Sequence, residues 1–210
     1  MMTERKIKLT ENFVKQKMNG YDSGHDWWHI VRVRKIAHFI NAEEEIADPF
    51  ILDIAALLHD TVDSKFADGK TEQGYSEICD FLNETGMSEI SDQVIEVIRN
   101  VSFSKKDKTG NLNDPVLLIL QDADKLDAID AIGIARAFIY GGFRNNPIYI
   151  PEEKTEGTSK STIGHFYDKL LKLKGMMNTT AGCRIAQARH EILETFLEQF
   201  YKEWDFGTKD

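Results

Sequence analysis

The segment from Pro49 to Leu58 constrains the fold of this chain more than any other, because as a helix it is apolar around almost its whole circumference. Asp48 and Pro49 supply the N-cap and first-turn residues with which such a helix begins. A helix without a polar face needs neighbours on every side to keep its side chains from water. We therefore expect a helix over residues 49–58 at the centre of the fold.

The rest of the chain shows further helical patterns. Apolar residues recur at helical spacing, and Pro, Gly and Asn-Gly signals mark the helix ends. The expected helices lie at residues 3–18, 26–42, 71–85, from Ser91 through Val101, from 114 to 127 with a continuation kinked near Gly133 as far as Tyr140, at 162–174 and at 180–204. The best local candidate for an isolated strand is Pro147 to Pro151. The sequence predicts an all-α fold, with a single domain over residues 1–210.

The longest stretch without a periodic pattern runs from Gly141 to Ser161. An irregular segment of this length inside a compact domain is unusual and is often a lid or a binding loop. Arg144 in this segment could close over a nucleotide, and a contact between subunits is the alternative.

Composition places the chain among cytoplasmic globular proteins. Of its 210 residues, 41% are hydrophobic, and no apolar run approaches the roughly 20 residues of a membrane span. The N-terminus is charged rather than apolar, so it does not resemble a secretory signal. The formal charge of −9 argues against a nucleic-acid-binding protein, which is usually basic. Cys79 and Cys183 lie far apart and outside any CxxC pair, so we expect two buried free thiols.

The central apolar helix ends in His59 and Asp60, a pair that could bind a metal ion. Adjacent residues on a helix point about 100° apart, so one ion at the helix end could reach both side chains. Asp63 follows one turn later, and His29 lies 30 positions before His59 among apolar residues. Divalent cations favour this mixture of imidazole and carboxylate ligands.

A further carboxylate ligand is expected from the helix that begins near residue 114. Its aspartates stand among Ala, Leu and Ile at Asp122, Asp124, Asp127 and Asp130. An ionised aspartate in an apolar stripe requires a partner, because burial of an unpaired charge is costly. Asp124 and Asp127 share a helix face, whereas Asp122 points about 160° away from Asp124. Spacing alone leaves Asp122 and Asp124 open as the ligand.

Five segments together resemble the HD-domain metal-dependent phosphohydrolase superfamily, whose pattern is H…HD…D on a helical bundle. The segments are Gly24–Val33, Leu57–Asp60, Asp122–Ala128, Gly133–Arg136 and His165–Leu170. They look like the small bacterial HD proteins, among which some are nucleotide pyrophosphohydrolases. In the Ala-Asp-x-Leu segment of that superfamily the aspartate after alanine is the ligand, which selects Asp124.

The resemblance implies one divalent ion held by His29, His59, Asp60 and Asp124. Two nitrogens and two carboxylates suit a six-coordinate Mn²⁺, our first expectation, or Mg²⁺, Co²⁺, Ni²⁺ or Fe²⁺, with positions left for water and phosphate oxygens. Some HD relatives hold two metals with extra histidines after the His-Asp pair. The later histidines here, His165 and His190, are in no such motif.

Asp63 is the candidate catalytic residue, because it could orient or deprotonate the attacking water. HD hydrolases of the guanosine-tetraphosphate type have two acids in HDxxED, and here Asp63 matches the first while Ser64 replaces the second. This departure argues against guanosine tetraphosphate as the substrate. The alternative role for Asp63 is to cap or salt-bridge the loop.

The candidate substrate-binding residues lie in or beside the family-like segments: His25, Lys65, Asp127, Arg136 and Lys169. His25 is expected to contact phosphate or the leaving group, and the three cations could neutralise phosphate charge. The alternative for each cation is an ordinary solvated position. His25 and His29 also have the i, i+4 spacing of a zinc-protease helix, but that alternative leaves His59 without a role.

The resemblance implies hydrolysis of (deoxy)nucleoside triphosphates to monophosphate and pyrophosphate by a metal-activated water. The alternatives are a nucleoside monophosphatase or phosphodiesterase on the same fold, and a non-catalytic nucleotide-binding regulatory module. The expected partner is a small phosphorylated molecule, with no nucleic acid and no membrane, and a homodimer stays open.

Overall fold

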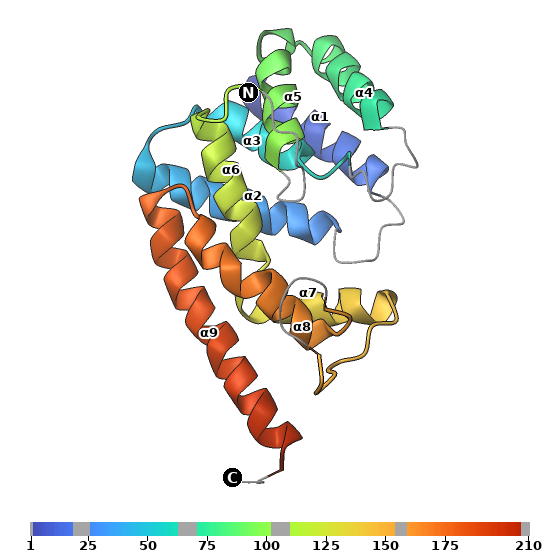
Figure 1. Cartoon of the computed structure of the whole chain (residues 1–210). Coiled ribbons are helices and arrows are strands. Elements are labelled where there is room, and N and C mark those ends of the chain that lie inside the picture. The colour runs from blue at the N-terminus through green and yellow to red at the C-terminus, as the bar shows by residue number, and fades with distance from the viewer. Residues whose placement is uncertain (1, 19–25, 63–70, 102–109, 154–158, 207–210) are drawn as a thin grey trace. The chain divides into compact units, whose positions relative to one another are not determined.

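Every regular element in the described part of the chain is a helix, as a computed structural model shows (Figure 1). The structure describes residues 2–18, 26–62, 71–101, 110–153 and 159–206. The elements are α1 (Met2–Lys17), α2 (Trp27–Glu44), α3 (Pro49–Leu58), α4 (Thr71–Glu84), α5 (Ser88–Val101), α6 (Pro115–Asp127), α7 (Asp130–Phe143), α8 (Thr162–Asp168), the 3-10 helix η1 (Leu170–Met176) and α9 (Thr180–Trp204). The all-α prediction is confirmed.

The helices fall into two compact units, Met1–Asp124 and Lys125–Asp210. The first unit holds α1 to α5 and all of α6 except its last turn. The second unit holds that last turn and α7, α8, η1 and α9. A single domain over residues 1–210 stays a prediction.

Helix α3 is the centre of the first unit, where it packs against α1, α2 and α5 (Figure 1). Leu52, Ile54, Leu57 and Leu58 all have 0% of their surface exposed. Each such side chain contributes about 1.5–3 kcal/mol by leaving water. The prediction that the apolar helix lies at the centre is confirmed.

The start of α3 follows from its two capping residues. The Asp48 carboxylate accepts hydrogen bonds from the amides of Phe50 and Ile51 at 2.8 and 3.0 Å, and Pro49 occupies the first turn. Such a cap contributes about 1 kcal/mol to helix stability. The cap fixes where α3 begins, and His59 is the C-cap residue at the other end of the helix.

A partly buried ion pair joins α2 to α3. Arg34 donates from Nε and Nη2 to the two carboxylate oxygens of Asp53 at 2.5 and 2.8 Å. His38 Nε2 lies 2.5 Å from Asp53 Oδ1, and Arg34 Nη1 donates to Glu11 of α1 at 2.8 Å. Burial by itself raises the pKa of the Asp53 carboxyl, but the hydrogen bonds from His38 and Arg34 and their charges outweigh burial and hold this pKa below its ordinary 3.8.

The lowered pKa of Asp53 predicts a specific loss of stability in acid. A carboxyl whose pKa is lower in the folded than in the unfolded state stabilises the fold fully above its ordinary pKa. That contribution disappears as the pH falls below 3.8 and through the folded-state pKa. We expect the unfolding free energy, measured by urea titration between about pH 5 and pH 2.5, to fall more steeply for the wild type than for Asp53→Asn. Equal slopes would contradict this assignment.

One predicted helix is wrong, because residues 114–140 form two helices and not one. Helix α6 ends at Asp127, Ile129 is extended, and Asp130, the first residue of α7, has a positive φ of 75°. Gly133, where we expected a kink, instead allows α7 to approach the end of α6 closely. A Cβ at Gly133 would collide with the carbonyl group of Ala128.

We expect Gly133→Ala to destabilise the second unit by about 2 kcal/mol, because overpacking against rigid backbone typically costs 1–3 kcal/mol. Gly142→Ala on the same helix is the matched control, since nothing lies within 4 Å of a Cβ built there. An exposed helical Gly→Ala change stabilises by up to about 1 kcal/mol. Urea unfolding followed by circular dichroism measures both variants, and a neutral Gly133→Ala would refute the close approach.

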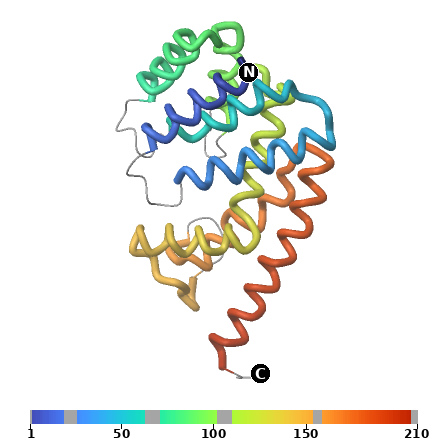
Figure 2. The backbone as a smooth tube through the Cα atoms, turned by 180° about the vertical axis from the view of Figure 1, so that it is seen from behind, coloured from blue at the N-terminus to red at the C-terminus, as the bar shows by residue number. Residues whose placement is uncertain are grey.

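The second unit is organised along α9, a helix of 25 residues (Figure 2). Helix α7 and η1 pack against α9, and α8 packs against both α7 and η1. Tyr149 lies edge-on to three rings near the end of α9, with centroid distances of 5.1–5.8 Å to Phe200, Tyr201 and Trp204. These aromatic contacts hold the segment after α7 against α9.

The irregular segment after α7 is shorter than predicted, because α7 continues through Gly141 and Gly142 to Phe143. The segment from Pro147 to Pro151 is not a strand. Its carbonyls at Pro147 and Ile148 instead accept hydrogen bonds at 2.9 Å from the amides of Thr162 and Ile163, at the start of α8. Residues 154–158 lie outside the described part, so a lid stays a prediction.

Other details of the predicted elements also differ. The helix expected over 162–174 is α8 followed by η1, because Lys169 between them departs from helical backbone angles. Helix α5 begins at Ser88, three residues earlier than predicted. Neither cysteine is fully buried as predicted: Cys79 is half-buried, and Cys183 is exposed because it lies on the outward face of the first turn of α9. No helix in the described part of the chain combines the length and the apolar character that a membrane crossing requires.

Candidate metal centre

His59 is the C-cap residue of α3, and its ring is held by the helix that it ends. Its Nδ1 lies 2.8 Å from the carbonyl oxygen of Ala56, one turn earlier. A carbonyl oxygen only accepts hydrogen bonds, so Nδ1 carries the proton of the neutral ring and donates it to Ala56. The other nitrogen, Nε2, therefore keeps a lone pair that can bind a metal ion.

His29 on α2 brings a second imidazole to the same place. The N-cap residue Asp26 fixes the first turn of α2 by accepting the His29 amide at 2.9 Å. The Nε2 atoms of His29 and His59 lie 3.3 Å apart, and their side chains are only 1% and 3% exposed. Two nitrogen ligands at right angles around one ion, each about 2.1 Å from it, are about 3 Å apart. The two rings therefore have the spacing of ligands that share one ion.

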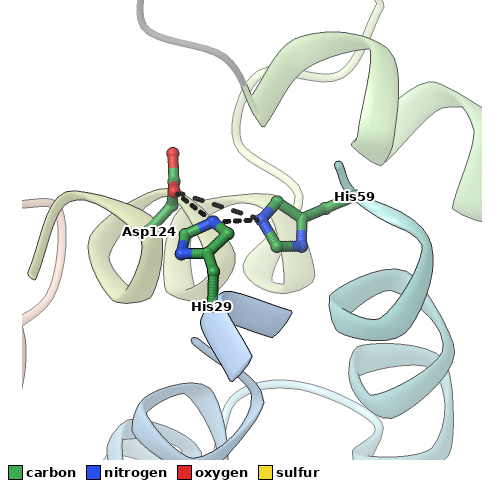
Figure 3. Close-up of side chains that lie close together, drawn as sticks. All are labelled: His29, His59 and Asp124. Carbon is green, nitrogen blue, oxygen red and sulfur yellow. Dashed lines mark hydrogen bonds and ion pairs between the residues drawn. The ribbon is translucent and has the colours of Figure 1, made fainter. Parts of the chain in front are cut away.

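One carboxylate completes the group, and a second lies beside it. Asp124 Oδ1 lies 3.5 Å from His29 Nε2 and 4.0 Å from His59 Nε2, so the three side chains converge on one point (Figure 3). Asp60 Oδ2 lies 3.8 Å from His29 Nε2. The side chain of Asp124 is 32% exposed and that of Asp60 is 15% exposed, unlike the buried rings. Water and a ligand can therefore reach the group from the carboxylate side.

The geometry also separates Asp124 from Asp122, which the helical spacing left open. Asp122 is fully buried, with 0% of its surface exposed, and is outside the donor group. Among the described residues, the only three that offer donor atoms within 4.8 Å of one another are His29, His59 and Asp124. Two imidazoles and carboxylate oxygens at this spacing fit a divalent cation with open coordination positions.

Comparison with known proteins decides the family. Residues 27–129, which include all four of these side chains, match the HD domain family. An HD-superfamily hydrolase from Bacillus thuringiensis has the same fold, with a TM-score of 0.78 and 40% identity over 97% of this chain and 98% of that one. This chain is an HD-domain protein.

The whole chain also has a relative of nearly the same length. The uncharacterized protein YpgQ of Bacillus subtilis is 38% identical over 203 residues, which cover 95% of this chain and 94% of YpgQ. A crystal structure of YpgQ in complex with ADP matches with a TM-score of 0.78 and 36% identity, over 94% of this chain and 97% of that one. The predicted resemblance to small bacterial HD proteins is confirmed.

The other predicted site residues of the HD protein divide into two sets. His25, Asp63 and Lys65 lie outside the described residues, so their roles stay predictions. Asp127 and Arg136 lie in the second unit, where Arg136 Nη1 donates to Asp127 Oδ2 at 2.6 Å. The Asp127 side chain is only 2% exposed. Because Asp127 is the last residue of α6 and Arg136 lies in α7, this ion pair links the two helices.

Lys169, the remaining predicted substrate-binding residue, is the C-cap of α8 in the second unit. Its backbone amide donates to the carbonyl oxygen of His165 at 3.0 Å, and the residue as a whole is half-buried. A role in binding phosphate stays a prediction for Lys169, as it does for Arg136.

Two supports of the HD centre were missed by reasoning from the sequence. The Ala56 carbonyl orients His59, and the i, i−3 spacing within the apolar helix could have indicated it. Gly74 of α4 lies against Val62, since a Cβ there would be 3.0 Å from both Val62 γ-carbons. This contact packs α4 against the turn that follows Asp60, and no local pattern in the sequence predicts it.

Proposed function

We propose that this HD-domain protein is a metal-dependent phosphohydrolase that converts (deoxy)nucleoside triphosphates to monophosphates and pyrophosphate. The observation that carries the proposal is the donor group of His29, His59 and Asp124, with Asp60 beside it. The proposed ion is a single Mn²⁺, which accepts this mixture of nitrogen and carboxylate ligands. A divalent ion bound here would lower the pKa of a coordinated water and neutralise phosphate charge.

A nucleotide is the proposed ligand because YpgQ has been crystallised with ADP and the two chains are related along almost their whole lengths. ADP carries a base, a ribose and two linked phosphates. A relative that binds ADP supports a nucleoside polyphosphate as the substrate class more than a simple phosphate monoester.

The charges at the mouth of the site explain why a cation would be needed for a polyphosphate. Asp60 and Asp124 are the more exposed members of the group, and both are carboxylates. Two negative charges facing an anionic substrate repel it, and the repulsion is stronger where water is partly excluded. Binding of a triphosphate at this place therefore depends on positive charge between the carboxylates and the phosphates.

The chain's own residues would divide the remaining tasks. The Ala56 carbonyl keeps His59 in the tautomer that presents Nε2 to the ion. Asp60 and Asp124 would bind the ion from the more exposed side of the site, where its free coordination positions could face the substrate. We propose Asp63 as the acceptor of the proton from the attacking water, with His25 and Lys65 as phosphate contacts.

The test uses the full chain, Mn²⁺ and a panel of nucleoside mono-, di- and triphosphates. We expect phosphate to be detected from triphosphates only when inorganic pyrophosphatase is added, because the product is pyrophosphate. Chelation with EDTA should abolish the release and added Mn²⁺ should restore it. Phosphate released directly from monophosphates would indicate a nucleoside monophosphatase, and no metal-dependent release from any nucleotide would reject the proposal.

A further inference from the structure

The Arg34–Asp53 ion pair lies between the same two helices that bring His29 and His59 together. Helices α2 and α3 are antiparallel neighbours, so the His29–His59 contact and the Arg34–Asp53 pair are two contacts along one interface. Arg34 is five residues from His29, and Asp53 is six from His59. At 1.5 Å per residue these separations are about 8 and 9 Å along rigid helices. A shift of one helix against the other at the ion pair would therefore also change the separation of the two imidazoles.

The geometry of the ion pair resists such a shift. Arg34 contacts both oxygens of Asp53, at 2.5 and 2.8 Å, so a planar guanidinium meets a planar carboxylate through two parallel hydrogen bonds. Sliding or rotation of α2 against α3 breaks at least one of these bonds. Lysine, a point charge on a flexible stem, has no equivalent constraint.

The remaining contacts hold the ion pair from both sides. The third donor of Arg34 reaches Glu11 on α1 at 2.8 Å, and His38 contacts Asp53 at 2.5 Å. The Asp53 side chain is only 4% exposed in a helix that is otherwise apolar. A buried ion pair gives little net stability compared with well-packed apolar residues. Its planar geometry does give a unique register.

We propose that Arg34 and Asp53 are positioning residues for the metal centre, because they fix the register of α2 against α3 and with it the separation of the two histidine Nε2 atoms. A metal site tolerates errors of only about 0.2 Å in its ligand distances. The observed Nε2–Nε2 distance of 3.3 Å is already close to the separation that one ion requires. This inference rests on the proposed metal site, and it adds residues that do not touch the ion.

The proposal is tested by titrating Mn²⁺ into the full-length protein by calorimetry, with Co²⁺ absorption as a report on ligand geometry. Arg34→Lys keeps the charge but loses the two parallel hydrogen bonds. We expect it to weaken Mn²⁺ binding about 10- to 100-fold, as changes to residues that orient metal ligands commonly do. Its Co²⁺ spectrum should change, while its thermal unfolding midpoint stays close to that of the wild type.

A double variant separates positioning from stability. Arg34→Met with Asp53→Leu replaces the pair by apolar residues and removes both charges together, while Glu11 keeps Lys8 as a partner at 3.4 Å. It should unfold at or above the wild-type temperature and still bind Mn²⁺ about 10- to 100-fold more weakly. Arg99→Lys is the matched control, because Arg99 makes the same two-bond contact, at 2.7 Å each, with the exposed Glu72 on α4. It should leave Mn²⁺ affinity unchanged.

The outcomes distinguish this inference from the metal site itself. If the wild type binds Mn²⁺, His59→Ala does not, and both Arg34 variants bind with wild-type affinity, the positioning role is wrong and the metal site stands. If the wild type does not bind Mn²⁺, the proposed metal site and the positioning role both fail. Weaker binding in both Arg34 variants, with Arg99→Lys unchanged, supports the proposal.

Discussion

Replacement of His59 by alanine is expected to lower nucleotide hydrolysis by at least about 10³-fold, equivalent to roughly 4 kcal/mol in the barrier, because the ion that would activate water loses a ligand. The Nε2 atom of His59 is one of the two buried nitrogens at the centre of the donor group. Apart from His29, which already supplies its own nitrogen, no described histidine belongs to that group, so none is placed to replace His59. Calorimetric titration with Mn²⁺ should show affinity reduced by more than about 100-fold, beyond the loss from an orienting residue alone.

Thr61→Val is the matched control for His59→Ala, because it changes the same turn without removing a metal donor. Thr61 Oγ1 donates to the Leu58 carbonyl oxygen at 2.7 Å, so its loss disturbs the end of α3 alone. We expect Thr61→Val to be less stable by about 1 kcal/mol and to bind Mn²⁺ normally. If His59→Ala hydrolyses triphosphates at the wild-type rate while folded, the proposed centre is not the site of the reaction.

The sequence predicted the centre of the fold well because the information was local. A helix that is apolar all round has to be buried, and Asp48 and Pro49 mark its start, so both the bounds and the position of α3 were predicted. The break between α6 and α7 was missed for the opposite reason. Asp130 takes a positive φ and Gly133 meets the Ala128 carbonyl, and neither condition is visible in a pattern of apolar residues.

The candidate site could be predicted only in part from spacing. Helical periodicity gives the angle between Asp122 and Asp124 but not the direction of either, and the resemblance to HD proteins was needed to select Asp124. The structure brings Asp124, and not Asp122, to the two histidines. The Arg34–Asp53 pair could not be predicted, because it joins residues 19 apart in sequence and depends on how their two helices meet.

The side chains of α3 also predict the largest effect on stability. Leu57 lies two residues before His59, has no exposed surface, and belongs to a helix packed on three sides. Leu57→Ala would remove buried methyl groups and leave a cavity that rigid neighbours cannot close. Such substitutions cost about 2–5 kcal/mol, and the enclosed position of Leu57 favours the upper half of that range.

Leu9→Ala on α1 is the control for the Leu57→Ala prediction, because it removes the same groups from a side chain that is 37% exposed. Urea unfolding should show a loss of less than about 1 kcal/mol for Leu9→Ala, since little apolar surface returns to water there. A similar loss for the two variants would contradict the central position of α3. Because α3 carries His59, weaker packing at Leu57 should also reduce Mn²⁺ affinity before the unit unfolds, whereas Leu9→Ala should leave that affinity unchanged.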